Sequence, residues 1–182
     1  IAMLWQQYYP GVMLHIVEAT NNQLLNMVLE NQADIMIGNI HEEIPELKKV
    51  RLYDESLNIL VPKTQQYADL VHLESSELSA EKLLPYAFVM NTKNDIVGRY
   101  GNIFFEKNNF VPKIAAISDN AETCIEMCIK GMGLYICPSI FLKNKPQLVE
   151  TLHCCPLNIQ YSISAAYHKS IYNSRMITKF IN

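Results

Sequence analysis

The chain has 182 residues, 49% of them hydrophobic and 18% charged, and its formal net charge is −3 at pH 7. These values are typical of a globular protein with a sizeable core, built as one domain or two small lobes. The negative charge excludes a basic surface for nucleic-acid phosphates. No apolar run approaches the roughly 20 residues that cross a bilayer, and no signal peptide is recognisable, so we expect a cytoplasmic chain without membrane contact.

The five cysteines are odd in number and form no CxxC pair, which argues against a disulfide framework and for a reducing compartment. Cys124 and Cys128 have the i, i+4 spacing of a metal or redox pair. They also fall on the apolar stripe of a predicted helix, where cysteine packs as a small hydrophobe. We favour the core interpretation for this pair. For Cys154-Cys155 we favour a plain structural role over a strained vicinal disulfide.

The N-terminal part predicts a strand–helix–strand unit. A helix over 2–9 is stopped by proline and glycine, and the pattern over 12–17 predicts a strand covered on both faces. Thr20-Asn21-Asn22 offers caps for an amphipathic helix. That helix ends near Asn31, a residue that tolerates the left-handed conformation. A short buried strand is expected over 34–38.

The remainder repeats the alternation of strand and helix. An apolar strand over Leu57–Pro62 leaves the first lobe, and a turn-rich stretch runs from Lys63 to Glu81. One helix then extends to about Asn108, another ends at Lys130-Gly131, and a terminal helix is expected over Ser170–Ile181. The later strands are expected over Ala87–Met90, Ile114–Ile117, Leu134–Cys137 and Ile159–Tyr167. Two α/β lobes in tandem, with the chain crossing between them twice, follow from this order.

Catalytic and metal-binding signatures are missing from the sequence. There is no GxSxG elbow, P-loop, GxGxxG or HExxH motif. Gly131-Met132-Gly133 is best explained as a helix stop with close packing. The histidines are scattered, and His72, His153 and His168 are predicted to have no nearby Cys or Asp at ligand spacing. We therefore expect no enzyme, no cofactor and no metal.

Three strand-to-helix junctions carry clusters of small polar residues: Thr20-Asn21-Asn22, Thr92-Lys93-Asn94-Asp95 and Ser118-Asp119-Asn120. Each cluster serves as a helix cap or as part of a polar pocket, and Asp119 with Glu122 has capping-box spacing. Ligands of open α/β sheets bind beyond the carboxyl ends of the strands, where helix N-termini favour negative charge. A small anionic ligand is the natural expectation, although Asp95 and Asp119 compete for the same donors.

The order of several motifs resembles the effector-binding domain of LysR-type transcriptional regulators. The resemblance spans nearly the whole chain and rests on segments that are each weak but follow in the family's order and spacing. They are Pro10-Gly11-Val12-Met13-Leu14-His15-Ile16-Val17-Glu18, Leu24-Leu25, Val28-Leu29, Ala33-Asp34-Ile35-Met36-Ile37, Leu57 to Pro62, Gly98-Arg99-Tyr100, Phe104-Phe105, Asn109-Phe110-Val111-Pro112 and Ile129-Lys130-Gly131-Met132-Gly133-Leu134-Tyr135-Ile136-Cys137-Pro138.

The resemblance implies an α/β fold of type 2 periplasmic binding proteins, with two Rossmann-like lobes, two crossover strands (57–62 and 159–164) and an effector between the lobes. Lobe I would comprise 1–62 and 163–182, and lobe II 63–162. The family's first strand, its following Ser/Thr loop and its winged helix-turn-helix would precede Ile1; the opening residue itself suggests a piece of a longer protein. The implied ligand-binding residues are Thr20, Asn21, Thr92, Asn94, Ser118 and Asn120. Ala19 replaces the family's usual glycine.

By this resemblance the chain senses a small metabolite and modulates transcription as a homodimer or tetramer, with DNA bound only through the winged helix-turn-helix domain. Two other functions on the same fold stay open. One is a solute-binding protein of a transport system, against which the five cysteines count. The other is a prephenate dehydratase-like enzyme, for which no catalytic motif speaks.

Overall fold

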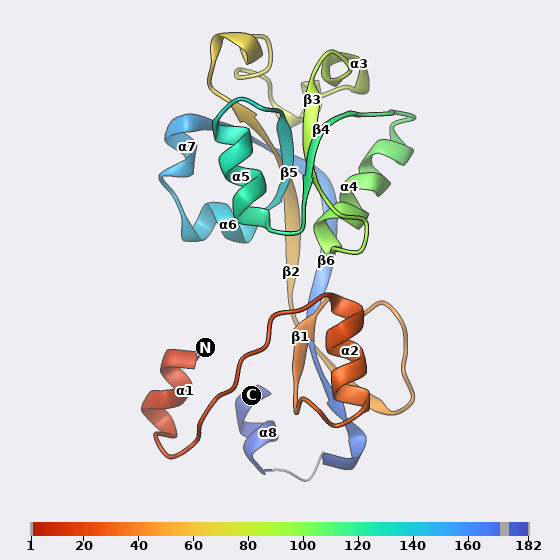
Figure 1. Cartoon of the computed structure of the whole chain (residues 1–182), viewed down its shortest axis with the longest axis vertical. Coiled ribbons are helices and arrows are strands. Elements are labelled where there is room, and N and C mark those ends of the chain that lie inside the picture. Colours follow the sequence, from red (N-terminus) through yellow and green to blue (C-terminus); the bar gives the residue numbers. More distant parts are fainter. Residues whose placement is uncertain (1, 172–174, 182) are drawn as a thin grey trace. The chain divides into compact units, whose positions relative to one another are not determined.

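The computed structural model describes residues 2–171 and 175–181 and consists of α-helices and β-strands (Figure 1). Six strands form one sheet in the order β1-β6-β2-β5-β3-β4. The strands are β1 (Met36–Gly38), β2 (Leu47–Pro62), β3 (Ala87–Asn91), β4 (Lys113–Ser118), β5 (Leu134–Pro138) and β6 (Leu152–His168). The α-helices are α1 (Ala2–Tyr8), α2 (Asn21–Leu29), α3 (Ala80–Leu83), α4 (Ile96–Lys107), α5 (Ala121–Ile129), α6 (Ser139–Asn144), α7 (Leu148–Thr151) and α8 (Arg175–Ile181). The 3-10 turns are η1 (Gln65–Tyr67), η2 (Ser75–Glu77) and η3 (Lys169–Ile171).

The chain divides into two compact units. Unit 1 comprises Ile1–Tyr53 and Ile163–Asn182, and unit 2 comprises Asp54–Ser162. Both boundaries fall inside long strands, β2 and β6. The first boundary precedes Leu57–Pro62, whereas the sequence analysis placed the change of lobe after that segment. The reason is pairing: Leu57 to Leu60 lie antiparallel to β5 and so belong to unit 2.

Unit 2 has a core in which α5 packs on the central strands. Leu60, Val89 and Tyr135 come from three different strands and are buried with the inner face of α5. Cys124 and Cys128 are fully buried in this core and free, which confirms that they pack as hydrophobes. Burial raises the pKa of the Cys124 thiol to about 11 and that of Cys128 to about 12, so neither carries thiolate at neutral pH.

Unit 1 is built around a smaller cluster in which α2 covers β1 and the end of β6. Val28, Met36 and Ala166 are its buried centre, and β1 pairs antiparallel with β6. Thr20 caps α2 through a capping box with Gln23, as expected of a polar residue at this junction. Asn31 has a φ of 56°, which confirms the predicted left-handed stop of the helix.

The predicted strand over 12–17 was wrong: this stretch belongs to no strand in the structure. Val12 and Leu14 are half-buried and Met13 is exposed, but Ile16, which an alternating pattern would put on the face of Val12 and Leu14, is 68% exposed. A strand is defined by hydrogen bonds to a neighbour, and the pattern of one segment does not supply that neighbour. The terminal helix predicted from Ser170 begins at Arg175; residues 172–174 lie outside the described part of the chain.

Close packing of α4 on the end of β3 depends on Gly98. A Cβ atom there would lie 2.0 Å from the Thr92 carbonyl oxygen and 2.6 Å from that of Asn91. Both obstacles are backbone atoms, which move only if the loop after β3 moves. Gly101 lies one turn later on the same helix, and its added Cβ would meet the flexible tip of Met90 at 3.1 Å.

We predict that Gly98→Ala destabilises the protein by about 1–3 kcal/mol, the usual cost of overpacking, despite the gain in helix propensity. Gly101→Ala is the matched control, with the same propensity gain and only a side chain to displace. It should be near neutral or slightly stabilising. Urea unfolding measures both, and equal free energies of unfolding for the two variants would contradict the backbone clash.

Candidate functional site

The loops that follow β3, β4 and β5 lie at one edge of unit 2. β3 pairs in parallel with both β4 and β5. The carboxyl ends of parallel strands meet at the same sheet edge, so Asn91, Ser118 and Pro138 mark that edge, which lies at the lower end of unit 2 in Figure 1. We call it the carboxyl edge. The helices α4, α5 and α6 all begin there.

Asn91, at the end of β3, is hydrogen-bonded to both neighbouring strands. Its side chain is buried, accepts a hydrogen bond from the Tyr135 hydroxyl at 2.7 Å, and donates to the Ser118 carbonyl at 3.3 Å. Tyr135 is buried on β5, and its pKa is raised far above the ordinary value, chiefly by burial. The sequence analysis missed Asn91, although a polar residue that ends an apolar strand just before Thr92 was a usable signal.

The β3–α4 and β4–α5 loops are also linked directly. The Thr92 hydroxyl donates to the Asp119 carboxylate at 2.6 Å. Asp95 is the N-cap of α4 and accepts from the Val97 N–H at 2.8 Å. Asn94 is exposed beside them. The structure thus brings the two predicted polar clusters of unit 2 into contact at the carboxyl edge.

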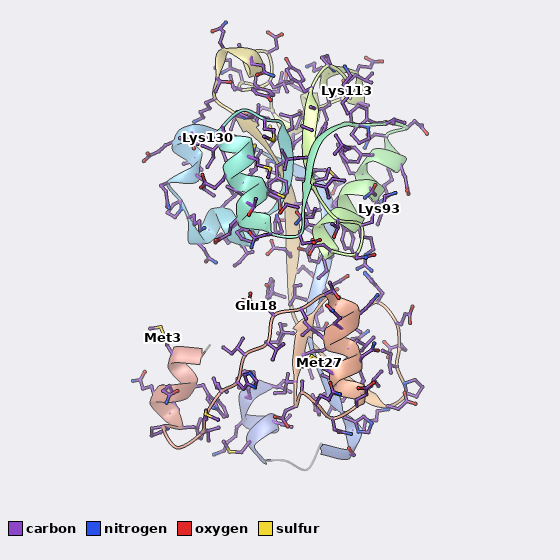
Figure 2. The ribbon with its side chains drawn as sticks, in the orientation of Figure 1. Met3, Glu18, Met27, Lys93, Lys113 and Lys130 are labelled. Atoms are coloured by element: carbon purple, nitrogen blue, oxygen red, sulfur yellow. The ribbon has the colours of Figure 1, made fainter. Side chains whose placement is uncertain are left out.

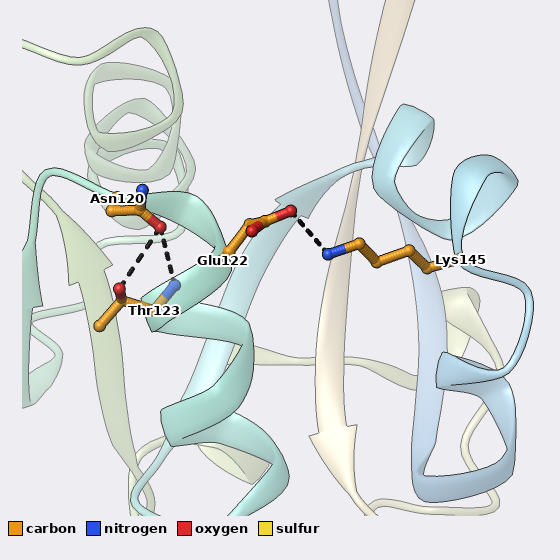
Figure 3. Close-up of polar contacts among 4 residues, drawn as sticks. All are labelled: Asn120, Glu122, Thr123 and Lys145. Carbon is orange, nitrogen blue, oxygen red and sulfur yellow. Dashed lines mark hydrogen bonds and ion pairs between the residues drawn. The ribbon is translucent and has the colours of Figure 1, made fainter.

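Asn120, not Asp119, caps α5, so the predicted Asp119–Glu122 capping box was wrong. The Asn120 side-chain oxygen accepts from the backbone N–H of Thr123 at 2.9 Å and lies 3.4 Å from its hydroxyl (Figure 3). Glu122 turns instead to Lys145, with 2.6 Å between carboxylate and ammonium (Figure 3). The Asp119 carboxylate holds Thr92, which is a contact between loops that sequence spacing does not encode.

A second polar cluster lies where β2 passes the start of α6, and the sequence analysis did not identify it. Leu57 of β2 is paired with Pro138, so the residues beside it lie at the carboxyl edge. The Ser139 hydroxyl lies 2.7 Å from the Ser56 hydroxyl, accepts from the Asn58 amide at 2.7 Å and donates to the Ser56 carbonyl at 3.1 Å. Glu55, also buried, accepts from the Ser56 N–H at 3.0 Å.

The predicted residues of unit 1 are engaged within that unit. Thr20 is exposed and exchanges hydrogen bonds with Gln23 in the capping box. Asn21 donates to the Asn39 carbonyl at 2.5 Å and accepts from the Asn39 N–H at 3.1 Å. Asn21 therefore holds the segment after β1 against the start of α2.

No group of three or more His, Cys, Asp or Glu suited to a metal ion occurs among the described residues. The prediction that His153 has no cysteine at ligand spacing was wrong. The Cys155 sulfur lies 3.0 Å from His153 Nε2. Side chains two residues apart on a strand share one face, which explains the contact. Within the described residues, no helix has the length and apolar character needed to cross a membrane.

The family model for the LysR substrate binding domain matches residues 2–182. The chain belongs to the LysR substrate-binding domain family. The resemblance seen in the sequence is therefore confirmed, and so is the α/β fold class, that of type 2 periplasmic binding proteins, with its six-stranded sheet.

Known proteins similar to this LysR substrate-binding domain are regulators. A curated relative, the uncharacterized HTH-type transcriptional regulator YybE of Bacillus subtilis (strain 168), is 23% identical over 137 residues, which are 75% of this chain and 45% of the relative. The chain thus spans less than half of that regulator. The regulatory domain of CcmR from Synechocystis PCC6803, in complex with 2-PG, has a TM-score of 0.81 at 17% identity, with 98% of this chain and 85% of that chain covered.

The effector binding domain of QuiR, in complex with shikimate, has a TM-score of 0.78 at 14% identity, with 98% of this chain and 84% of that chain covered. At such identities the structures establish the fold that the LysR substrate-binding domain shares with them.

The bond between Tyr135 and Asn91 gives a direct test of how the carboxyl edge is held. We predict that Tyr135→Phe lowers the free energy of unfolding by about 1–3 kcal/mol, because the buried Asn91 oxygen loses its hydroxyl donor. Tyr86→Phe is the control, since Tyr86 is half-buried and contacts Tyr67 through its ring. It should change stability by less than about 0.5 kcal/mol in the same urea titration. Equal losses in the two variants would contradict a special role for Asn91.

Proposed function

We propose that this LysR substrate-binding domain senses a small anionic metabolite at the carboxyl edge of unit 2 and thereby modulates DNA binding by the regulator of which it is part. The observation that carries the proposal is the linkage of the β3–α4 and β4–α5 loops, in which Thr92 bonds to Asp119 and Asn91 bonds to Ser118. Loops fixed before ligand arrives lose less conformational entropy on binding, which favours affinity.

The chemistry of the edge supports a small anion or an anionic group of a larger effector. α4 and α5 point their N-termini to this edge, and aligned peptide dipoles favour negative charge there. Ser118, Asn120 and exposed Asn94 add hydroxyl and amide groups, and Thr20 and Asn21 are the ligand residues we predict in unit 1. Asp95 and Asp119 oppose the anion, so the preferred ligand carries hydroxyl groups that donate to these carboxylates as well as an acid group.

The proposed mechanism is non-enzymatic. An effector shifts a conformational equilibrium only by its difference in affinity between the two conformations. Binding at the carboxyl edge stabilises one conformation of the domain, and a linked DNA-binding domain reads that change. The ligand-bound structures of the QuiR and CcmR domains support a small-molecule role for the fold. Because the chain covers less than half of the curated regulator, the action on DNA rests on family membership.

The test is a thermal-shift screen of carboxylates, amino acids and phosphorylated metabolites, because a ligand that binds the native state raises its melting temperature. We expect a hit that is recovered unchanged after incubation. Thr92→Ala and Ser118→Ala should weaken the hit about tenfold each through loss of a polar contact. Asn120→Ala and Asn120→Ser separate the two roles of that residue, since serine restores the helix cap but not the amide. Unchanged affinity in all four variants would contradict the assignment, and a chemical product would show an enzyme.

We also propose that the domain forms a homodimer, directly or within a tetramer, through the outer edge of β4. β4 is an end strand of the sheet, and an end strand presents unpaired backbone groups. Its apolar side chains face solvent: Ile114 is 45% exposed and Ile117 is 61% exposed, and Val111 just before it is 85% exposed. Exposed apolar side chains along an unpaired strand edge favour a protein interface.

We predict that Ile117→Lys weakens self-association at least about tenfold, because a charge is buried in the proposed interface. Met132→Lys is the matched control, since Met132 is 49% exposed in the turn between α5 and β5. Sedimentation velocity over a concentration series measures both variants. A monomeric parent protein, or equal effects of the two substitutions, would contradict the β4 interface.

A further inference from the structure

Unit 2 has a second concave site, separate from the carboxyl edge. A cavity of about 570 Å³ is bordered by Lys63, Thr64, Gln65, His72 and His153, together with two small apolar residues. These residues come from the segment after β2, the turn after η1 and the start of β6. Every polar side chain in the lining is able to donate hydrogen bonds, and none of the lining residues, all within the described part of the chain, is a carboxylate.

This cavity lies at the opposite sheet edge from the carboxyl edge. β2 runs antiparallel to β5, so it ends at Pro62 beside the start of β5 at Leu134. The Tyr67 hydroxyl of η1 donates to the Gly131 carbonyl, just before β5, at 3.0 Å. In Figure 1 the yellow segment that contains η1 lies at the upper end of unit 2. A ligand here would not compete with one at the carboxyl edge.

Lys63 is held in place but keeps donors for a ligand. Its ammonium donates to the Val149 carbonyl at 2.6 Å, and its backbone N–H donates to the Thr151 carbonyl at 3.0 Å. An ammonium group has three donors, so two are left beyond the bond to Val149. The backbone bond holds the main chain of Lys63 beside Thr151, and the bond to Val149 anchors the end of its side chain. The positive charge therefore stays near the cavity at little entropic cost.

His153 is oriented by a carbonyl and a thiol. Its Nε2 lies 2.9 Å from the Leu73 carbonyl oxygen and 3.0 Å from the Cys155 sulfur. A carbonyl oxygen only accepts, so Nε2 carries the proton of the neutral ring. Burial, together with the nearby Glu74 and Glu77 carboxylates, raises the pKa of Cys155 to about 11, so the thiol beside His153 stays neutral.

We infer that this cavity is a second binding site of the domain, specific for small oxyanions with two or more negative charges, such as phosphate esters or polycarboxylates. The Lys63 ammonium and the donor groups of Thr64, Gln65 and His72 line the cavity without a carboxylate among the lining residues, which suits a ligand whose several oxygens only accept. The volume lies within the range of small-molecule sites. The inference is independent of the effector proposed for the carboxyl edge, because no residue is shared between the two sites.

The test is NMR titration of the whole chain with inorganic pyrophosphate, with citrate, and with acetate at matched ionic strength. We expect pyrophosphate, citrate or both to shift the amides of 63–65 and 72 saturably, with a Kd of about 1 mM or tighter, and acetate to leave them unchanged. Binding of pyrophosphate indicates a site for phosphate esters, and binding of citrate indicates a site for polycarboxylates. Signals of 91–95 and 118–120 report the carboxyl edge in the same spectra, so failure of one site is distinguished from failure of the other.

The variant Lys63→Gln/His72→Gln removes two exposed side chains and should keep the fold, which its melting temperature checks. It should weaken probe binding at least about tenfold. Lys113→Gln and Lys130→Gln are matched controls, since both lysines are exposed on unit 2 (Figure 2) and neither lines the cavity, and they should bind like the parent. Unchanged affinity in the double variant, equal losses in the controls, or no saturable shift with either probe would overturn the second site.

Discussion

The buried amide of Asn91 is the interaction on which the rest of unit 2 depends. It accepts a hydrogen bond from the Tyr135 hydroxyl of β5 and donates one to the Ser118 carbonyl of β4, so one side chain links the strands on both sides of β3. In a buried environment, each such group left without a partner costs free energy. The loops that start from these strands therefore inherit a common geometry. This common geometry places the Thr92 hydroxyl within hydrogen-bond distance of the Asp119 carboxylate.

The same residues illustrate how capping and recognition compete at a sheet edge. Asn120 and Asp95 each satisfy an N–H group of their own helix, and Thr20 does the same in unit 1. A ligand that approaches these helices meets donors that are partly occupied already. Recognition then depends on the backbone N–H groups that the caps do not occupy and on the hydroxyl and amide groups between the two helices. This is why we expect an effector with hydroxyl groups as well as an acid group.

Local sequence patterns predicted the local features of this domain well. The capping role of Thr20, the left-handed Asn31, the glycine stop with a φ of 78° at Gly131, and the buried Cys124–Cys128 pair all follow from residue chemistry within one turn of helix. The family resemblance supplied the global arrangement, which periodicity alone gave only as two α/β lobes in tandem.

The features that the sequence did not predict correctly depend mostly on contacts between residues distant in sequence. The stretch 12–17 has the alternation of a strand but no paired neighbour. Asp119 contacts Thr92, and Ser139 contacts Ser56 and Asn58, over separations that no spacing rule covers. The contact between His153 and Cys155 is an exception, because the two residues lie close in sequence and on one face of the same strand.

The most direct test is to map the first small molecule that raises the melting temperature onto the domain by backbone amide NMR. If effector sensing occurs at the carboxyl edge, the largest shifts fall on 91–95 and 118–123 and saturate with the same Kd as the thermal effect. If the amide signals of 91–95 and 118–123 stay unchanged while the ligand saturates the protein, the account is contradicted.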